Sequence, residues 1–244
     1  MNHDDTSPAE PAIFLGIDVA GQKKTFVAGL SSSERGYKLV LPPEIMTLEQ
    51  IRDYCRDHNV LGVAIDAQLT ADLKENNGFR YGDRMLQGYL PKSCSNWVQS
   101  ANCLYAVPAR GRLLADHLAP LVGTIIETHP RASLLFALGL DSLVDIKKYK
   151  PRPRQTPIQR DACKESALSL WRSWTNRYHI QCEKDFRSDD ELDALVCASV
   201  VALLHAHPKQ LWRVPSQAEH PVGRGPLYVI RPDKKYLRRL RAYR

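Results

Sequence analysis

Residues 13–18 read Ile-Phe-Leu-Gly-Ile-Asp, an apolar run that ends on a carboxylate. Two later runs follow the same pattern: Val-Leu-Gly-Val-Ala-Ile-Asp at residues 60–66 and Gly-Thr-Ile-Ile-Glu at residues 123–127. Short apolar runs rich in isoleucine and valine are typical of buried strands. Ligands of open α/β sheets bind at the carboxyl ends of the strands. We therefore expect the three terminal acids to converge at one edge of a parallel sheet.

A fourth acidic group opens a strongly apolar helix near the C-terminus. Residues 188–191, Ser-Asp-Asp-Glu, match a capping box and predict that this helix starts at Ser188. Asp190 and Asp193 are three residues apart, so they share one face of the helix. That face borders the buried stripe, where an unpaired carboxylate is costly. A bound metal ion or a buried arginine would account for Asp193.

Each acid also has a simpler interpretation on its own. Asp18 and Asp66 suit turns at strand ends, and Asp190 suits the positive end of a helix dipole. Glu127 is harder to explain in this way, because glutamate is depleted in strands. Two bare carboxylates about 4 Å apart repel by roughly 4 kcal/mol at an effective dielectric constant of 20. A cluster of these acids therefore needs protons or cations, and hard oxygen ligands favour Mg²⁺ or Mn²⁺.

Basic residues are unevenly distributed along the 244-residue chain, whose formal net charge is +7. Residues 147–160 contain six basic residues and no acidic one, and residues 231–244 contain seven basic residues against Asp233. Each segment carries +6, so the rest of the chain is slightly acidic. Two basic patches beside an acidic pocket suit a polyanionic substrate. Solvated surface segments are the alternative interpretation.

The composition argues against several classes of protein. A hydrophobic content of 43% and a charged content of 25% are those of an ordinary globular chain. The six cysteines form no Cys-x-x-Cys pair and no zinc-site spacing. The longest apolar stretch, residues 194–206, is shorter than the roughly 20 residues that span a bilayer. We expect a cytoplasmic protein without a signal peptide or a membrane segment.

The order of the predicted elements indicates one α/β domain. Its β-β-β-α-β start consists of strands at 13–18, 25–30 and 37–41, a helix capped by Thr47 and a strand at 60–65. Pro42 and Pro43 are expected to end the third strand. The expected organisation is a disordered lead-in (1–11), a single domain (12–207) with mainly helical insertions (67–122 and 139–187), and a basic C-terminal extension with a short strand (208–244).

These motifs resemble those of a known superfamily. The β-β-β-α-β start, with acids ending its first and fourth strands, is similar to the ribonuclease H-like fold. Residues 190–195 resemble the last-helix motif of RuvC-type Holliday-junction resolvases. The closer resemblance is to a family of predicted RNase H-like nucleases, domain of unknown function 429. Its motifs occur in order at residues 16–20, 64–67, 127–132 and 190–198, with an Arg-x-x-Asp-Arg element at Arg80, Asp83 and Arg84.

The resemblance covers residues 13 to 205 and implies a mixed sheet of order 3-2-1-4-5, with strand 2 antiparallel and helices on its flanks. Asp18 would lie beside Asp66, under the start of the last helix. The resolvases usually carry glutamate at the end of the fourth strand, so the shorter Asp66 would change the metal spacing. The implied catalytic acids and metal ligands are Asp18, Asp66, Glu127, Asp190 and Asp193.

The function that the resemblance implies is that of a metal-dependent nuclease or phosphodiesterase. Two Mg²⁺ or Mn²⁺ ions would activate water and stabilise the leaving oxygen, with Asp18 bridging both ions. His129 would assist proton transfer, although a histidine before a proline at a helix start is more often a cap. The phosphates of DNA or RNA would be bound by three arginines: Arg80, Arg84 and Arg131. Resolvase-like enzymes often act as dimers, so a homodimer is one expected state.

Two other functions remain open at this point. Residues 18–21, Asp-Val-Ala-Gly, and Thr25 faintly resemble the first phosphate loop of the actin and sugar-kinase superfamily, which would make the protein an ATP-binding phosphotransferase. The sequence contains neither a second glycine-rich phosphate loop nor an adenosine motif. The other alternative is a non-catalytic nucleic-acid-binding module that relies on the two basic segments, whose binding would weaken steeply with salt.

Overall fold

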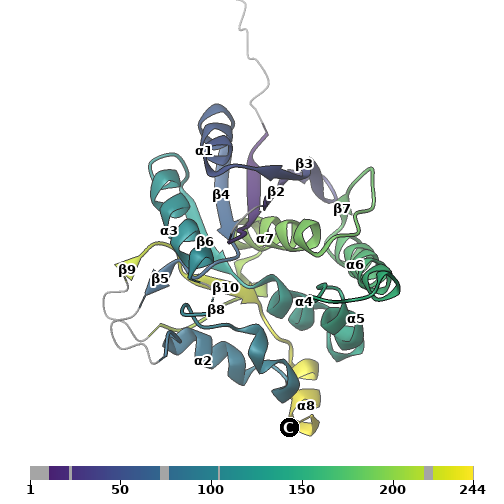
Figure 1. The fold of residues 1–244 in the computed structure, drawn as a ribbon. Coiled ribbons are helices and arrows are strands. Elements are labelled where there is room, and N and C mark those ends of the chain that lie inside the picture. Colours follow the sequence, from purple (N-terminus) through teal and green to yellow (C-terminus); the bar gives the residue numbers. More distant parts are fainter. Residues whose placement is uncertain (1–10, 22–23, 72–76, 104, 217–221, 244) are drawn as a thin grey trace, which may run out of the picture.

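A mixed, largely parallel sheet with helices on its flanks forms the body of the molecule (Figure 1). The computed structural model describes residues 11–21, 24–71, 77–103, 105–216 and 222–243, so the predicted lead-in lies outside the described residues apart from Pro11. In the described part, the eight strands of the main sheet are β1 (Ile13–Asp18), β2 (Thr25–Ser33), β3 (Gly36–Met46), β4 (Val60–Ile65), β6 (Thr124–Thr128), β7 (Ile180–Gln181), β8 (Leu211–Arg213) and β10 (Leu227–Ile230). A separate small sheet pairs β5 (Thr70–Ala71) with β9 (Val222–Gly223).

The helices surround this sheet on both faces (Figure 1). The α-helices are α1 (Leu48–Asp57), α2 (Tyr81–Gly88), α3 (Ala106–Leu118), α4 (Pro130–Leu138), α5 (Leu143–Lys148), α6 (Pro157–Arg177), α7 (Asp189–Ala206) and α8 (Lys234–Ala242). Three short 3₁₀ turns complete the described elements: η1 (Lys92–Trp97), η2 (Leu140–Ser142) and η3 (Pro208–Gln210). Across the described residues, none of the helices has the length and apolar character needed to cross a membrane.

The order of strands in the main sheet is β7-β3-β2-β1-β4-β6-β10-β8. Its central part, β3-β2-β1-β4-β6, is the predicted order 3-2-1-4-5, because the fifth predicted strand is β6. β2 is antiparallel to β1, whereas β1, β4, β6 and β10 run parallel. The predicted α/β class and its RNase H-like sheet order are therefore confirmed. β8 and β10, from the segment described above as an extension, are strands of this same sheet.

Alternation along β1 sends its side chains to two different cores. Ile13, Leu15 and Ile17 pack with residues of α1 and α3 on one face. Phe14 belongs to the core on the opposite face, which contains α4, α6 and α7. Because successive side chains of a strand point to opposite faces, Asp18 faces the α7 side.

α7 is the helix that the acidic motif predicts, and it is the most deeply buried one. Ser188 accepts a hydrogen bond from the backbone N–H of Glu191, and the Glu191 side chain accepts one from the backbone N–H of Ser188, which confirms the predicted capping box. Every residue from Leu192 to Leu203 is buried, as expected for a helix enclosed on all sides.

Gly16 allows the backbone of α7 to lie directly on β1. A Cβ atom at this position would lie 2.0 Å from the backbone nitrogen of Ala198 and 2.1 Å from the carbonyl oxygen of Ala194. No side chain fits into that space, since both neighbours are helix backbone. The contact fixes the height of α7 above the sheet and the position of its first turn above the carboxyl end of β1.

The third strand is longer than the sequence suggests. Pro42 and Pro43 were expected to end it, but β3 continues through both residues to Met46. The pairing with β2 shifts register between Val27 and Gly29, so the prolines fall at a bulge, where a missing N–H is tolerated. Within the described residues, β7 pairs with β3 only at Tyr37 and Lys38, which leaves the proline segment at an open edge.

We predict that Gly16→Ala lowers the free energy of unfolding by at least about 3 kcal/mol, because the methyl group must push α7 off the sheet. For a chain of this size the melting temperature should fall by roughly 6–12 °C. Gly88→Ala is the matched control, since a Cβ atom there meets nothing within 4 Å. Equal melting temperatures for the two variants, measured by calorimetry, would contradict the close approach of α7 to β1.

Candidate functional site

Three of the predicted acids meet at the carboxyl edge of the sheet. Asp18 ends β1 and Asp66 directly follows β4. The pairing of Ile17 with Ile65, and the hydrogen bond of 2.9 Å from the Asp66 backbone nitrogen to the carbonyl of Ile17, put the two acids side by side. Asp193 joins them from α7, and one carboxylate oxygen of each residue lies within 4.8 Å of the others. We call Asp18, Asp66 and Asp193 the acid triad.

The direction of α7 explains why Asp193 reaches this place. The His205 ring near the end of α7 packs against Phe14 near the start of β1, with 5.0 Å between the ring centroids. The helix therefore runs antiparallel to β1, and its N-terminal turn lies above the strand's carboxyl end. The partial positive charge of a helix N-terminus is favourable beside carboxylates. The placement of Asp193 follows from the Gly16 contact one turn further along.

Lys150 supplies a cation to the acid triad from another part of the chain. Its ammonium group forms an ion pair with Oδ2 of Asp193, and the hydroxyl of Tyr149 donates a hydrogen bond of 2.8 Å to Oδ1. Asp193 is 0% exposed, whereas the side chain of Lys150 is 33% exposed. Lys150 therefore extends from solvent into the triad. In the sequence Lys150 is one of the six basic residues of the segment 147–160, and no local motif distinguishes it.

Burial and the neighbouring acids disfavour negative charge on Asp18 and Asp66, and Lys150 offsets this only in part. Burial raises the pKa of Asp18 well above its usual value, Lys150 opposes this rise, and Asp193 and Asp66 add to it. Burial likewise raises the pKa of Asp66 to about 7, with Lys150 lowering it and Asp193 and Glu127 raising it. Burial also disfavours the charge of Lys150, but Asp193 and the other acids outweigh burial and raise the pKa of the lysine.

Two further acids stand at the start of α7. Asp190, a predicted ligand, lies outside the group of three, although it raises the pKa of Asp18 through its charge. Burial raises the pKa of Asp190 itself, and Lys150 opposes the rise. Asp189 was not singled out from the sequence, yet burial and then Asp190 raise its pKa to about 7. Both residues extend the negative charge outward from the triad.

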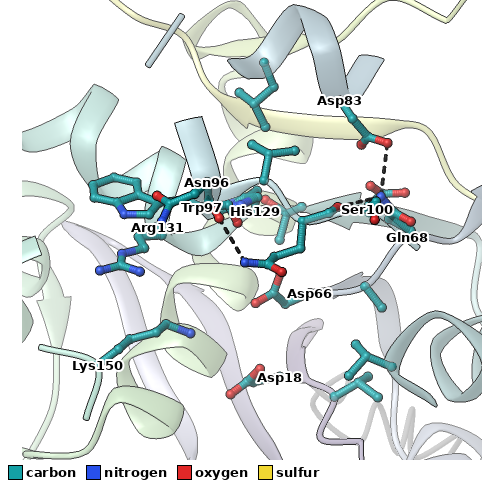
Figure 2. A pocket seen from close by; sticks show the side chains of 18 of the residues that line it. Asp18, Asp66, Gln68, Asp83, Asn96, Trp97, Ser100, His129, Arg131 and Lys150 are labelled. Carbon is teal, nitrogen blue, oxygen red and sulfur yellow. Dashed lines mark hydrogen bonds between the residues drawn. The ribbon is translucent and has the colours of Figure 1, made fainter. Parts of the chain in front are cut away.

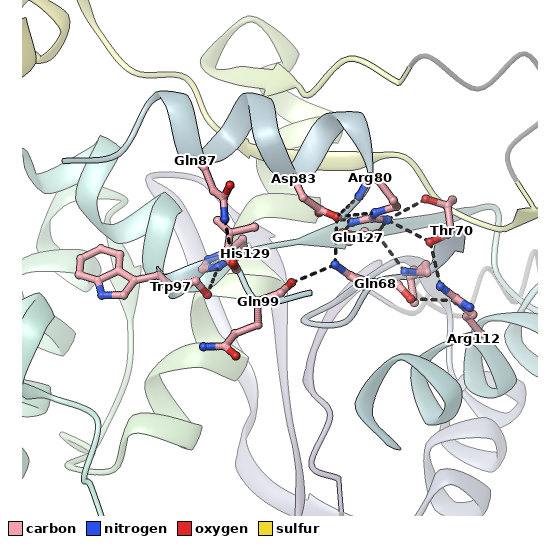
Figure 3. Close-up of polar contacts among 12 residues, drawn as sticks. Gln68, Thr70, Arg80, Asp83, Gln87, Trp97, Gln99, Arg112, Glu127 and His129 are labelled. Atoms are coloured by element: carbon pink, nitrogen blue, oxygen red, sulfur yellow. Dashed lines mark hydrogen bonds and ion pairs between the residues drawn. The ribbon is translucent and has the colours of Figure 1, made fainter. Parts of the chain in front are cut away.

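Glu127, the fifth predicted acid, points away from the triad. The register pairs Ile17 with Ile65 and Ile65 with Glu127, so these three side chains share the face that α1 and α3 cover. The carboxylate of Glu127 accepts hydrogen bonds from Arg80 (2.5 and 2.7 Å) and from the backbone nitrogen of Leu69 (2.9 Å) (Figure 3). These contacts give Glu127 a structural role outside the group of three acids, and its metal-ligand role stays a prediction.

Arg80 is likewise occupied by protein groups. Besides Glu127, its guanidinium donates to Asp83 (2.8 and 3.1 Å) and to the hydroxyl of Thr70 (2.7 Å). Burial disfavours the charge of Arg80, but Glu127 and Asp83 outweigh it and raise the pKa. Arg80 thus forms a buried clamp that fastens the start of α2 to the sheet, and its phosphate-binding role stays a prediction. A buried pair of this kind is costly to break, by about 3–5 kcal/mol.

The other predicted binding residues also contact the protein itself. Arg84 is exposed and lies over the ring of Phe79, 4.0 Å from its centroid. The guanidinium of Arg131 donates to the carbonyls of Ile146 and Lys147 at 3.0–3.2 Å, while it lines the cavity beside the triad. Arg131 therefore holds the end of α5 in place, and the phosphate-binding role remains a prediction for both arginines.

His129 is the N-cap of α4. Its Nδ1 atom accepts a hydrogen bond of 3.2 Å from the backbone N–H of Ala132. The other nitrogen, Nε2, is then protonated and donates to the carbonyl of Trp97 at 3.1 Å (Figure 3). Burial lowers the pKa of this histidine. A neutral ring engaged at both nitrogens serves as a cap, so its role in proton transfer stays a prediction.

A cavity of about 810 Å³ opens above two members of the triad, Asp18 and Asp66 (Figure 2). Asp18 and Asp66 lie at its base, together with Thr128. The segment 83–100, which contains α2 and η1, forms its roof, and residues 147–152 form part of its side. Three basic residues of the segment 147–160 line the cavity: Lys147, Lys150 and Arg152. The acid triad is thus a cluster of carboxylates that could hold a metal ion at the base of a partly basic cavity.

Comparison with known proteins identifies a family. The family described as "Protein of unknown function (DUF429)" matches residues 16–220. The chain belongs to the DUF429 family. The match includes the acid triad, Lys150 and the roof of the cavity. Neither the curated proteins nor the solved structures give a significant match, so the chemistry of this DUF429 protein has to be argued from its geometry.

We predict that Asp66→Asn raises the melting temperature of the DUF429 protein at pH 8 in EDTA by about 2–4 °C, or about 1 kcal/mol. The pKa of Asp66 is about 7 in the folded protein, against 3.8 for the free side chain. The folded state therefore binds more protons than the unfolded state between these values, and stability falls as the pH rises through them. Asparagine removes that loss, so the gain should vanish near pH 4.

Asp161→Asn serves as the control for this experiment, because Asp161 is exposed on α6 and pairs only with Lys164 among its described contacts. Its effect on the melting temperature should be the same at both pH values. If Asp66→Asn lowers the melting temperature equally at pH 4 and pH 8, the triad does not store electrostatic repulsion.

Proposed function

We propose that this DUF429 protein is a metal-dependent nuclease or phosphodiesterase that acts on DNA or RNA, with Mg²⁺ or Mn²⁺ held by the acid triad. The observation that carries the proposal is the convergence of three carboxylates from β1, β4 and α7 within 4.8 Å. Hard oxygen ligands in this number suit either cation. The raised pKa values of Asp18 and Asp66 fit it, because burial and the neighbouring acids disfavour their charged forms and a bound cation would offset that cost.

The residues around the triad fit the needs of phosphodiester hydrolysis. Asp18, Asp66 and Asp193 would hold the cations, whose bound state would supply an activated water and charge stabilisation of the leaving oxygen. Lys147 and Arg152 line the cavity and can bind phosphate oxygens through charge-assisted hydrogen bonds. Asp189 and Asp190 lie at the start of α7, where they can add ligands at the rim. The resemblance to RNase H-like nucleases supports nucleic acid as the substrate.

A non-catalytic nucleic-acid-binding module is the second candidate, and one observation favours it. The ion pair between Lys150 and Asp193 gives the triad a cation from the chain itself. If this pair is permanent, the triad is a structural ion cluster and the basic residues bind nucleic acid without turnover. The two candidates differ in whether divalent cations bind at all.

The nuclease proposal predicts cleavage of single-stranded DNA or RNA oligonucleotides in the presence of Mn²⁺ and none in EDTA. Asp18→Asn, Asp66→Asn and Asp193→Asn should each lower the cleavage rate at least about 100-fold, because each removes a charged ligand of the cation. Gel electrophoresis of end-labelled oligonucleotides measures the rate. Asp161→Asn should keep the activity of the unmodified protein.

Unchanged cleavage by all three asparagine variants would contradict the assignment, because the activity would then come from another site or a contaminant. Oligonucleotide binding that needs no divalent cation, without cleavage by the unmodified protein, would favour the binding module. Circular dichroism of each variant establishes that a loss of activity is not a loss of fold.

Lys150→Met separates the two candidates through stability alone. Without Lys150, Asp193 is left buried beside two other acids, and the metal-free variant should lose about 3–5 kcal/mol of stability. Under the nuclease proposal Mn²⁺ replaces the lost cation, so the melting temperature should rise more on Mn²⁺ addition in Lys150→Met than in the unmodified protein. Differential scanning fluorimetry with and without Mn²⁺ measures this difference.

Lys150→Arg is the control, since it keeps the positive charge and should respond to Mn²⁺ as the unmodified protein does. A melting temperature of Lys150→Met that is low and indifferent to Mn²⁺ would mean that the triad binds only its own lysine. That result would support the structural ion cluster.

A further inference from the structure

We propose that the cavity above the acid triad is a binding site for one unpaired nucleotide, with the base against the roof segment around Trp97 and the phosphate toward the triad. The inference rests on the proposed function and narrows its substrate to single strands, strand ends and unpaired nucleotides. It is supported by the fixed roof, by the size of the cavity and by polar atoms that have no partner within the described residues.

The roof of the cavity is fastened at several points, so the cavity is already formed in the free protein. The side-chain amide of Gln68 donates to Asp83 (3.0 Å) and to the carbonyl of Gln99 (3.1 Å). His129 donates to the carbonyl of Trp97, and Lys147 donates to the hydroxyl of Ser93 (2.8 Å). With the clamp of Arg80 and Glu127, these bonds tie both ends of the roof to the sheet and to α5 (Figure 3).

The size of the cavity admits a nucleotide but not a duplex. A volume of about 810 Å³ lies within the roughly 300–1,000 Å³ typical of small-molecule sites. A DNA duplex, whose major groove alone is about 12 Å wide, cannot enter such a space. Asp193 is fully buried beneath it. Enzymes that act on a nucleotide inside a pocket too narrow for a duplex take it from a single strand or extrude it from the stack.

Two polar atoms at the cavity have no partner among the described residues. Thr128 is 2% exposed, and its hydroxyl makes no hydrogen bond there. The side-chain oxygen of Gln68 is also buried and without a partner, although its nitrogen donates twice. Both residues line the cavity. Buried polar groups are normally satisfied, so this pair indicates a ligand that carries both hydrogen-bond donors and acceptors.

Trp97 gives the roof an aromatic side chain of fixed orientation. The guanidinium of Arg131 lies over its ring, 4.3 Å from the centroid, and Arg131 is itself anchored to carbonyls of α5 (Figure 2). Aromatic side chains in nucleic-acid sites bind bases by stacking, with a tolerance for sequence. Lys147 and Arg152 line the same cavity and suit a phosphate group.

The combination selects the ligand class. A sugar phosphate would contact the basic side chains of Lys147 and Arg152 but not stack on Trp97. An aromatic amine would stack on Trp97 but not contact the basic side chains. A nucleotide uses both: the edge of its nucleobase carries hydrogen-bonding groups for Gln68 near the roof, and its sugar or phosphate can pair with Thr128 beside the triad. The aromatic ring of Trp97 and the unpaired polar atoms of Gln68 and Thr128 thus both indicate a nucleotide as the ligand.

Binding of nucleoside 5′-monophosphates in EDTA tests the site without any turnover. Isothermal titration calorimetry should give measurable binding of adenosine or cytidine 5′-monophosphate and at least about tenfold weaker binding of ribose 5-phosphate, which has no base to stack. Trp97→Leu should reduce this preference for the nucleotide over ribose 5-phosphate. Equal affinities for the nucleotides and ribose 5-phosphate in the unmodified protein would contradict binding of the nucleobase against the roof around Trp97.

Thr128→Val is the sharper variant, because it keeps the shape of the side chain and removes only the hydroxyl. We expect its melting temperature to be unchanged or higher and its nucleotide affinity to fall about two- to tenfold, the effect of one hydrogen bond. Ser33→Ala is the matched control, since Ser33 also has a buried hydroxyl without a described partner but does not line the cavity. Unchanged affinity in Thr128→Val would argue against a ligand at that hydroxyl.

The substrate preference is tested separately with Mn²⁺ and three oligonucleotides: a single strand, a blunt duplex, and the same duplex with one unpaired nucleotide. Cleavage of the single strand and at the unpaired nucleotide, with at least about 100-fold slower cleavage of the blunt duplex, is the expected result. Equal cleavage of the blunt duplex would overturn the single-nucleotide site and leave the nuclease proposal intact. Nucleotide binding without cleavage of any substrate would overturn the nuclease proposal and support the site.

Discussion

The direct contact of the α7 backbone with β1 at Gly16 is the constraint on which the site depends. Strand and helix approach so closely that no Cβ atom fits between them. Because α7 runs antiparallel to β1, this contact places Asp193 above the carboxyl ends of β1 and β4. The register of those two strands then sets Asp18 beside Asp66. The packing of α7 against one glycine thereby determines how the three carboxylates of the triad are arranged.

The electrostatic consequence is a cluster of like charges held together by the hydrophobic core. Burial raises the pKa of Asp18 and Asp66, and the neighbouring acids raise them further. Lys150 and the hydroxyl of Tyr149 offset part of this repulsion at Asp193. Like-charged groups that are forced together by packing are common where a protein binds a cation or tunes a proton. The core of the protein therefore holds together three acids that could bind a cation.

Much of the fold was predictable because its signals are local. Apolar runs, capping boxes at Thr47 and Ser188, and the order of elements predicted most strands and helices, whereas the central sheet order came from the resemblance to the ribonuclease H-like fold. The prediction that Pro42 and Pro43 end the third strand was wrong, because an edge strand with a bulge accepts prolines that a central strand would not. The helix at Lys234–Ala242 was missed, because its basic composition was taken only as charge.

The site was less predictable because it depends on register and on distant contacts. Glu127 ends an apolar run of the sequence as Asp18 and Asp66 do, but β6 continues to Thr128, and the pairing of Glu127 with Ile65 places its side chain on the opposite face. That pairing is not visible in the sequence. Arg80 appeared suited to phosphate, yet its guanidinium forms a buried ion pair with Glu127, 47 residues further along the chain. Lys150 reaches Asp193 from a segment distant in the sequence, and only the packing of α5 against the core brings the two together.

The central claim is that Asp18, Asp66 and Asp193 hold a divalent cation between them. Anomalous diffraction from crystals grown with Mn²⁺ tests it most directly. The account predicts an anomalous peak within about 2.0–2.6 Å of carboxylate oxygens of the triad, with the ammonium group of Lys150 moved away from Asp193. Crystals that bind no Mn²⁺ at the triad, with Lys150 still paired to Asp193, would contradict it.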